Sequence, residues 1–160
     1  MITGITRTIT IVAAVGAGVT GGVYFAFSTF VMTGLRRLPD RQGLTAMQAV
    51  NRAAPSPLFM TALFGTAALA AGLIVAGIRR WGDAGATQLV VGSSLYLVSV
   101  VLTIAFHVPR NEALDKVEPS SAAAAQRWLD YASVWTAGNH VRTLSAVAGA
   151  VVLTLALVAD

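Results

Sequence analysis

Long apolar stretches, separated by short polar segments, dominate the pattern of residues along the chain. Four stretches contain no charged residue: 8–35, 53–78, 84–109 and 143–159. A helix that crosses a bilayer needs about 20 mainly apolar residues, which each of the first three stretches can hold. The fourth reaches this length if its helix begins near Trp135. We therefore predict transmembrane helices over residues 8–32, 57–78, 86–107 and 135–158.

The predicted fold is an all-α integral membrane four-helix bundle, formed as a single domain over residues 1–160. A chain of 160 residues has room for one domain. Hydrophobic residues make up 56% of it and charged residues 11%, whereas soluble domains carry about 25% charged residues. We expect short amphipathic helices around residues 44–53 and, before the last span, around residues 121–131. The composition excludes a soluble enzyme domain.

The absence of cysteine narrows the possible chemistry. It excludes disulfides, iron–sulfur ligation, thiolate metal sites and a cysteine nucleophile. The formal charge of +4 comes from basic residues scattered at predicted helix ends, so we expect no nucleic-acid partner. The two longer loops, around Arg41 and Lys116, hold most of these residues. By the positive-inside rule they face the cytoplasm, which predicts a multi-pass protein of the cell membrane.

Small and polar residues mark helix faces that point into a bundle. In the first span, Gly18, Gly22 and Ala26 recur every four residues. This spacing predicts close packing against another helix, in the bundle or in a homo-oligomer. The third span carries a polar stripe within about 100° of arc on a helical wheel. It comprises Gln88, Gly92, Tyr96, Ser99, Thr103 and His107.

Antiparallel spans bring distant polar residues to one membrane face. The ends of the first and third spans and the starts of the second and fourth lie on the same side of such a bundle. Arg142 is the strongest single signal there, because it falls slightly inside the apolar layer. An ionisable group at the centre of a membrane helix costs roughly 2.5–3.5 kcal/mol and usually faces a cavity or a partner. Alternatively, Arg142 extends its side chain to the interface.

The two histidines offer two kinds of chemistry. His140 can serve as a general base, because a neutral imidazole accepts a proton near pH 7; alternatively, it is an interfacial histidine bonded to a loop carbonyl. His107 ends the polar stripe of the third span. His140 and His107 are therefore an alternative pair of ligands for copper or haem iron, although two histidines without a recognisable spacing fit many arrangements.

Four segments of the chain resemble one family of membrane proteins. They are Gly22-Val-Tyr-Phe-Ala-Phe-Ser-Thr-Phe-Val-Met, Met47-Gln-Ala-Val-Asn-Arg-Ala-Ala-Pro, Val108-Pro-Arg-Asn-Glu-Ala-Leu and Trp135-Thr-Ala-Gly-Asn-His-Val-Arg-Thr. In this order they are similar to the anthrone oxygenase-like family of small bacterial and fungal membrane proteins, most of which are a domain of unknown function. The Asn-His-Val-Arg-Thr and Val-Pro-x-Asn-Glu stretches are the most specific.

Characterised relatives oxidise an anthrone, a reduced tricyclic aromatic ketone, to an anthraquinone with O₂. The resemblance implies a membrane-embedded monooxygenase whose partners are a lipophilic aromatic molecule, O₂ and membrane lipid. As catalytic residues it implies His140, Arg142 and Asn139. As substrate-binding residues it implies Asn51, Arg52, Asn111, Glu112 and Trp135. Two further substrate-binding residues are expected on physical grounds: Arg110, which lies at the same membrane face, and Tyr24, which adds to an aromatic wall. His107 departs from the family, in which asparagine more often precedes Val-Pro.

This hypothesis requires no bound cofactor. A base, His140, removes the activated benzylic proton, and the electron-rich phenolate reacts with O₂ directly. Arg142, Arg110 or Asn139 stabilises the developing oxyanion. The competing class is non-enzymatic, either an assembly partner or a transporter that uses the polar stripe. Four helices enclose little volume, and no predicted span is broken midway by glycine and proline as transporter spans often are, which disfavours transport.

Overall fold

The computed structural model describes residue 2 and residues 4–159. All regular secondary structure in these residues is helical. The elements follow in the order α1 (Gly4–Ala26), η1 (Phe27–Val31), α2 (Met32–Arg36), α3 (Asp40–Ala53), α4 (Pro57–Met60), η2 (Thr61–Gly65), α5 (Thr66–Arg79), α6 (Ala86–Leu102), η3 (Thr103–His107), α7 (Val108–Asp115) and α8 (Ala124–Ala156). The η elements are π-helical turns that continue the flanking helices without a break, so the chain is built from long rods.

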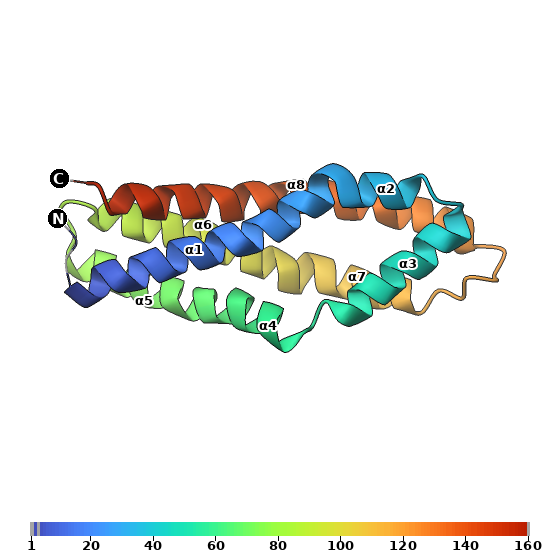
Figure 1. Cartoon of the computed structure of the whole chain (residues 1–160), viewed down its shortest axis with the longest axis horizontal. Coiled ribbons are helices and arrows are strands. Elements are labelled where there is room, and N and C mark those ends of the chain that lie inside the picture. Colours follow the sequence, from blue (N-terminus) through green and yellow to red (C-terminus); the bar gives the residue numbers. More distant parts are fainter. Residues whose placement is uncertain (1, 3, 160) are drawn as a thin grey trace.

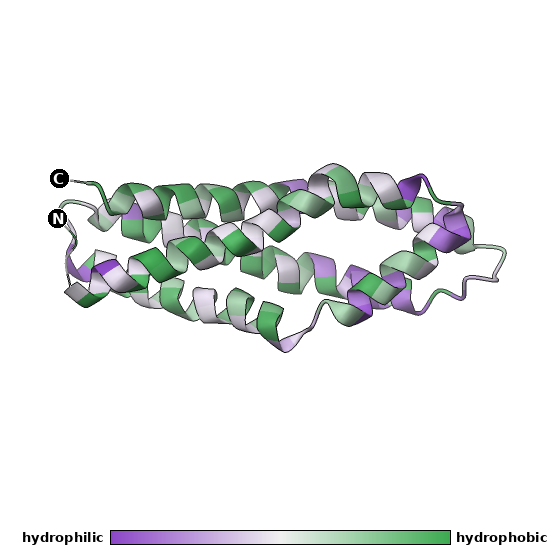
Figure 2. Cartoon of the chain, in the orientation of Figure 1, coloured by the Kyte–Doolittle hydropathy of each residue, from purple (hydrophilic) through white to green (hydrophobic). Residues whose placement is uncertain are grey.

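In the described chain, four rods are long and apolar enough to cross a membrane. They are Gly4–Arg36, Pro57–Arg79, Ala86–Asp115 and Ala124–Ala156. The rods form an elongated bundle with both chain termini at the same end (Figure 1). Hydrophobic residues cover most of their shared length, and hydrophilic residues gather towards the two ends (Figure 2). The predicted all-α transmembrane four-helix bundle is confirmed.

Beyond the shared length, α3, α7 and the first turns of α8 form a polar cap. Leu44 of α3 is buried with Trp128 of α8 in one hydrophobic cluster. Gln48 Nε2 of α3 donates to the carbonyl oxygens of Leu114 at 2.9 Å and Val117 at 2.8 Å. These contacts hold α3 across the end of the rods, where the sequence predicts an amphipathic helix.

The first rod exceeds its predicted span by four residues at each end, and the third and fourth rods extend further beyond theirs. The segment around residues 121–131, expected as a separate short helix, is largely the beginning of α8, because no glycine or proline interrupts the sequence between Ala124 and Gly138. The third rod continues through Pro109, where a helix end was expected. Proline lacks a backbone N–H, and the π-helical turn η3 directly before it shifts the hydrogen-bond register so that the rod accommodates this residue.

Helices α6 and α8 pack with their backbones in contact. A Cβ atom added at Gly149 would lie 2.9 Å from the carbonyl oxygen of Gly92 and 3.0 Å from the backbone nitrogen of Tyr96. A Cβ atom added at Gly92 would lie 2.9 Å from the backbone nitrogen of Leu153. Backbone atoms cannot move aside as a flexible side chain can, so both glycines set the distance between these helices.

The glycine face predicted to pack lies on the outside of this bundle. Gly18 and Gly22 are exposed, and no described residue offers an atom within 4 Å of a Cβ placed at either. Gly21 packs instead, 3.1 Å from Cγ2 of Val147. Adjacent helical residues differ by 100° in direction, and this helix carries small residues on both faces. The expectation of packing within the bundle is therefore wrong for Gly18 and Gly22, while packing in an oligomer stays a prediction.

The fold predicts that the first turn of α3, at Arg41, and the loop at Ser120 lie on one side of the membrane and the loop at Asp83 on the other. All three positions are exposed, and the chain has no native cysteine. Any labelling of a variant with one introduced cysteine therefore comes from that position. In intact cells, an impermeant maleimide should label Arg41→Cys and Ser120→Cys as one class and Asp83→Cys as the opposite class. Labelling of Arg41→Cys and Asp83→Cys from the same side would contradict the topology.

The contact between α6 and α8 predicts that Gly149→Ala destabilises the bundle. Overpacking should lower the free energy of unfolding by about 1–3 kcal/mol, even though alanine favours a helix by about 1 kcal/mol over glycine. Gly22→Ala is the matched control, because it has open space and should leave stability unchanged or slightly higher. Thermal unfolding in one detergent compares the variants, and equal midpoints would show that the two backbones are not in contact.

Candidate functional site

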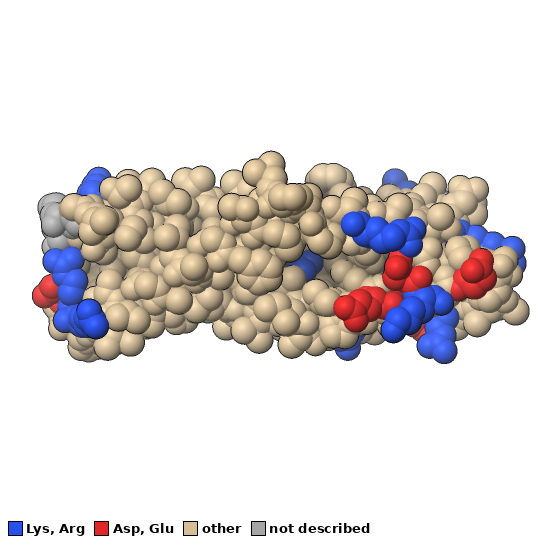
Figure 3. Space-filling view, turned by 90° about the horizontal axis from the view of Figure 1, so that it is seen from below, with Lys and Arg blue, Asp and Glu red and all other residues tan. Residues whose placement is uncertain are grey.

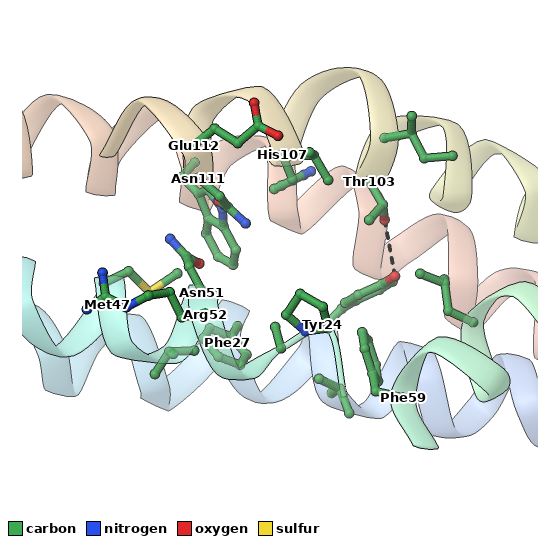
Figure 4. Close-up of a pocket in the computed structure, with 18 of the residues that line it drawn as sticks. Tyr24, Phe27, Met47, Asn51, Arg52, Phe59, Thr103, His107, Asn111 and Glu112 are labelled. Atoms are coloured by element: carbon green, nitrogen blue, oxygen red, sulfur yellow. Dashed lines mark hydrogen bonds between the residues drawn. The ribbon is translucent and has the colours of Figure 1, made fainter. Parts of the chain in front are cut away.

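A cavity of about 460 Å³ lies where the rods meet the polar cap. Its walls come from α1, η1, α3, α4, η2, η3, α7 and α8. Tyr24, Phe27 and Phe59 lie across this space from His107 and Asn111 (Figure 4). On the outer surface, Figure 3 shows basic atoms recessed in a hollow of the otherwise uncharged middle, beside a group of acidic and basic side chains.

The π-helical turns contribute to the cavity from separate rods. Phe27 of η1, Leu63 of η2 and Thr103 of η3 all line it. A π-helical turn holds more residues than an α-helical turn and redirects the side chains around it, and such turns are frequent at functional sites. Sequence periodicity cannot predict these turns, because each π-helical turn interrupts the 3.6-residue period of the α-helix.

Arg142 of α8 lines the cavity and is only 6% exposed. Its Nε donates to Asn139 Oδ1 at 3.0 Å, and its Nη2 donates to the same oxygen. Its Nη1 donates to Thr103 Oγ1 at 3.4 Å, and the guanidinium carbon lies 3.9 Å from the centre of the Tyr24 ring. No carboxylate oxygen of the described residues lies within 4.0 Å of it. Arg142 is thus a buried cation held by neutral groups.

The depth of Arg142 makes this arrangement unusual. The Tyr24 ring that it covers shares a buried cluster with Leu63. Leu63 follows the start of the second span at Pro57 by six residues, which is about 9 Å along a helix. The side chain does not extend to the interface, because its polar contacts are to Asn139 and Thr103 inside the bundle. An ionisable group in such a position usually faces a partner or a cavity.

Asn139 fixes the direction of the Arg142 side chain from behind the cavity wall. It is fully buried, and its Nδ2 donates to the carbonyl oxygen of Tyr24 at 2.8 Å and to Ser28 Oγ at 2.7 Å. The amide oxygen is therefore left to accept from Arg142. This network joins α8 to α1 and leaves the remaining N–H groups of the guanidinium for a ligand.

A second polar network surrounds Asn111 of α7. Its Oδ1 accepts from the Tyr131 hydroxyl at 2.9 Å and from Trp135 Nε1 at 2.8 Å. Asn51 Nδ2 of α3 donates to the Tyr131 hydroxyl at 3.4 Å. Asn51, Asn111 and Trp135 line the cavity, whereas Tyr131 stands behind them. The Trp135 ring also faces Arg142, with 5.3 Å between the ring centre and the guanidinium carbon.

Charged residues surround the mouth of the cavity at the polar cap. Arg52 of α3 forms an ion pair with Asp115 of α7. Glu112 and Lys116 also line the cavity, and neither has an ion-pair partner within 4.0 Å in the part of the chain that the structure describes. The cavity therefore joins an apolar interior to a charged rim.

Most of the residues predicted from the sequence meet at this cavity. Its walls include Tyr24, Asn51, Arg52, Asn111, Glu112, Trp135 and Arg142. Asn139 contributes through Arg142, as described above. Arg110 does not line the cavity; its guanidinium lies 3.5 Å from the centre of the Phe106 ring, and it donates to the carbonyl oxygen of Phe106 at 2.8 Å.

The two histidines are not brought together. His140 is exposed on the outer surface of α8 and does not line the cavity, because it is two residues, or about 200°, from Arg142 on the helix. The sequence predicts His140 and Arg142 in one pocket, and the structure corrects this: only Arg142 lines the cavity. His107 is fully buried, with Nδ1 3.0 Å from the carbonyl oxygen of Leu102 and its ring edge-on to Trp135.

The donor residues do not fit the alternative of a metal held by both histidines. One histidine lies inside the bundle and the other on its outside. Among the described residues, no three histidine, cysteine, aspartate or glutamate side chains gather as metal ligands.

Tyr131 is a polar residue of the site that the sequence analysis did not predict. Its segment was expected to be a separate helix, so its face relative to Trp135 was undefined. Once α8 is continuous, Tyr131, Trp135, Asn139 and Arg142 follow at intervals of four, four and three residues. This spacing places all of them on one helix face.

Comparison with known proteins identifies the family. No curated protein and no solved structure matches the chain significantly. The sequence profile of the family described as anthrone oxygenase matches residues 57–152, which include the second and third rods and most of α8. This match covers well over half of the 160 residues, and the chain therefore belongs to the anthrone oxygenase family.

Proposed function

We propose that this protein is a membrane-embedded oxygenase that uses O₂ to convert a hydrophobic, anthrone-like aromatic molecule into a quinone. The observation that carries the proposal is the state of Arg142: a buried guanidinium without a carboxylate partner among the described residues, facing an apolar and aromatic cavity. The anionic form of an aromatic ketone would provide the negatively charged partner that Arg142 does not find within the described chain. Membership of the anthrone oxygenase family supports the same class of reaction.

The size and walls of the cavity suit a flat aromatic ligand. Its volume of about 460 Å³ lies in the usual range of about 300–1,000 Å³ for small-molecule sites. Phe27, Phe59 and Trp135 supply aromatic surface, against which planar rings pack favourably. The polar groups are few and converge on particular positions, as in sites that orient an otherwise apolar ligand.

The position of the cavity suits a substrate that dissolves in lipid. Three of its apolar lining residues are also well exposed: Phe64 by 47%, Ile104 by 52% and Val108 by 40%. The cavity therefore borders the surface that a bilayer would cover. An anthrone and O₂ both partition into hydrocarbon, so both reach the site from the membrane.

The proposed reaction begins with loss of the benzylic proton of the anthrone. The electron pair of the C–H bond moves onto the carbonyl oxygen, and Arg142 stabilises the resulting oxyanion. Glu112, which lines the mouth and has no ion-pair partner in the described chain, is the proposed proton acceptor in place of His140. The carbanion carbon adds to O₂ and reduces it to a carbon-bound peroxide anion, which takes back the proton from Glu112 and becomes a hydroperoxide. Cleavage of the O–O bond, with loss of the remaining hydrogen on that carbon, releases water and leaves the quinone carbonyl.

This proposal predicts a large kinetic effect of Arg142→Gln. Loss of an oxyanion-stabilising group typically lowers turnover by about 10²–10³-fold, and we expect a decrease of that size in anthrone-dependent O₂ consumption by purified protein. Arg110→Gln is the matched control, because it removes the same charge from the same end of the bundle without touching the cavity. Its turnover should stay near that of the unchanged protein.

Folding of the two variants is checked by their melting temperatures in detergent. Arg142→Gln should remain folded, because it removes a buried charge that has no counter-charge in the described residues. Turnover by Arg142→Gln at the unchanged rate would contradict the oxyanion role. The proposed function would be contradicted if the folded protein without substitutions did not accelerate anthrone oxidation above the spontaneous rate.

A further inference from the structure

The hydrogen bonds around Asn111 determine which end of its amide faces the cavity. Its Oδ1 accepts from both the Tyr131 hydroxyl and Trp135 Nε1. An amide oxygen has two lone-pair directions, and both are used here. The amide nitrogen is therefore the end that remains for a ligand. Figure 4 shows Asn111 and Asn51 on facing walls, with their amide groups directed towards the space between them.

In the hydrogen-bond network behind Asn111, each bond has only one possible assignment of donor and acceptor. The Tyr131 hydroxyl has one proton, which it donates to Asn111, so it can only accept from Asn51. Hydrogen bonds in such a chain polarise one another and strengthen the terminal donor. The chain ends at the Asn111 amide, whose N–H groups become better donors as its oxygen accepts two bonds. A reversed amide would place its nitrogen against Trp135 Nε1, which can only donate.

We propose that Asn111 Nδ2 selects the substrate by donating a hydrogen bond to an oxygen atom other than the one bound by Arg142, and that Tyr131 is the positioning residue that holds this donor. Trp135 lies between the two donors, facing the guanidinium with its ring and holding Asn111 with its Nε1. The ligand class is a planar aromatic molecule with two oxygen substituents, one anionic at Arg142 and one hydroxyl or carbonyl at Asn111. This inference rests on the proposed function for the identity of the reacting ring.

Discrimination against other aromatic molecules follows from the same geometry. A hydrocarbon of equal size fills the apolar walls but leaves the Asn111 N–H groups desolvated without an acceptor. Sites built to bond a polar substituent reject analogues that lack it more strongly than apolar sites reject a change of size. Asn111 would therefore control which aromatic molecules bind rather than how fast a bound molecule reacts.

Equilibrium binding tests this inference separately from turnover. The probe is 1,8-dihydroxyanthraquinone, which is already oxidised at the reacting carbon, and the reference ligand is anthracene, which has the same rings without oxygen. Quenching of tryptophan fluorescence in detergent measures both. Asn111→Ala should weaken binding of the quinone about tenfold, as expected for one lost hydrogen bond, and leave anthracene binding unchanged. Asn111→Asp should weaken quinone binding at least as much, because an acceptor replaces the donor.

The role of Tyr131 is tested with a matched pair of variants. Tyr131→Phe should lower the preference for the quinone over anthracene, because the Asn111 amide loses the bond that fixes its direction. Tyr96→Phe is the control: its hydroxyl is also buried and donates to the Leu63 carbonyl oxygen at 3.0 Å, but Tyr96 does not line the cavity. A melting temperature for each variant shows that it is folded.

The results separate this inference from the proposed function. Unchanged quinone binding by folded Asn111→Asp would overturn the inference, whether or not the protein oxidises an anthrone. An equal loss of quinone and anthracene binding would also overturn it, because that result indicates damaged packing. Quinone selectivity that depends on Asn111 and Tyr131 supports it, even in a protein that does not accelerate anthrone oxidation.

Discussion

The contact between Gly92 of α6 and Gly149 of α8 fixes how closely two of the four rods approach each other. From that contact towards the polar cap, the inward residues of α8 become larger, from Ala146 through Arg142 to Trp135. Small residues let two helices touch, and large ones hold them apart. Arg142 and Trp135 line the cavity, and the π-helical turns η1, η2 and η3 contribute residues to the same space. Close packing at the glycines and the cavity therefore occupy different levels of one bundle.

The buried charge of Arg142 remains available to an anionic ligand because its contacts within the protein are neutral. A carboxylate partner would satisfy the guanidinium internally and leave little preference for an anionic ligand. Asn139 and Thr103 orient the group without cancelling its charge, and no acid of the described chain pairs with it. Desolvation makes an unpaired ion costly in a low-dielectric interior, and the same low dielectric makes a bound oxyanion correspondingly favourable. The arrangement thus favours ligands that become anionic at this position, as the proposed reaction requires.

The sequence was sufficient for the four-helix membrane bundle because charge-free stretches of bilayer length have few other structural solutions. It also contains the spacing of four and three residues that places Trp135, Asn139 and Arg142 on one face of a helix. It failed where two faces of a helix look alike: neighbouring small residues made Gly22 as good a candidate for packing as Gly21. His140 was grouped with Arg142 because both lie near the same membrane face, although residues two apart point in nearly opposite directions. Register alone would have separated them.

The cavity joins two environments that the proposed reaction needs at the same time. Its apolar residues border the bilayer, from which an aromatic substrate and O₂ would come. Its opposite side reaches the polar cap, where Glu112 and the Arg52–Asp115 ion pair meet water. Oxidation of an anthrone to a quinone releases water and moves protons, which a site enclosed by lipid would retain. For the proposed reaction, a position at the boundary between rods and cap would give the reactants an apolar route in and give protons and water a polar route out.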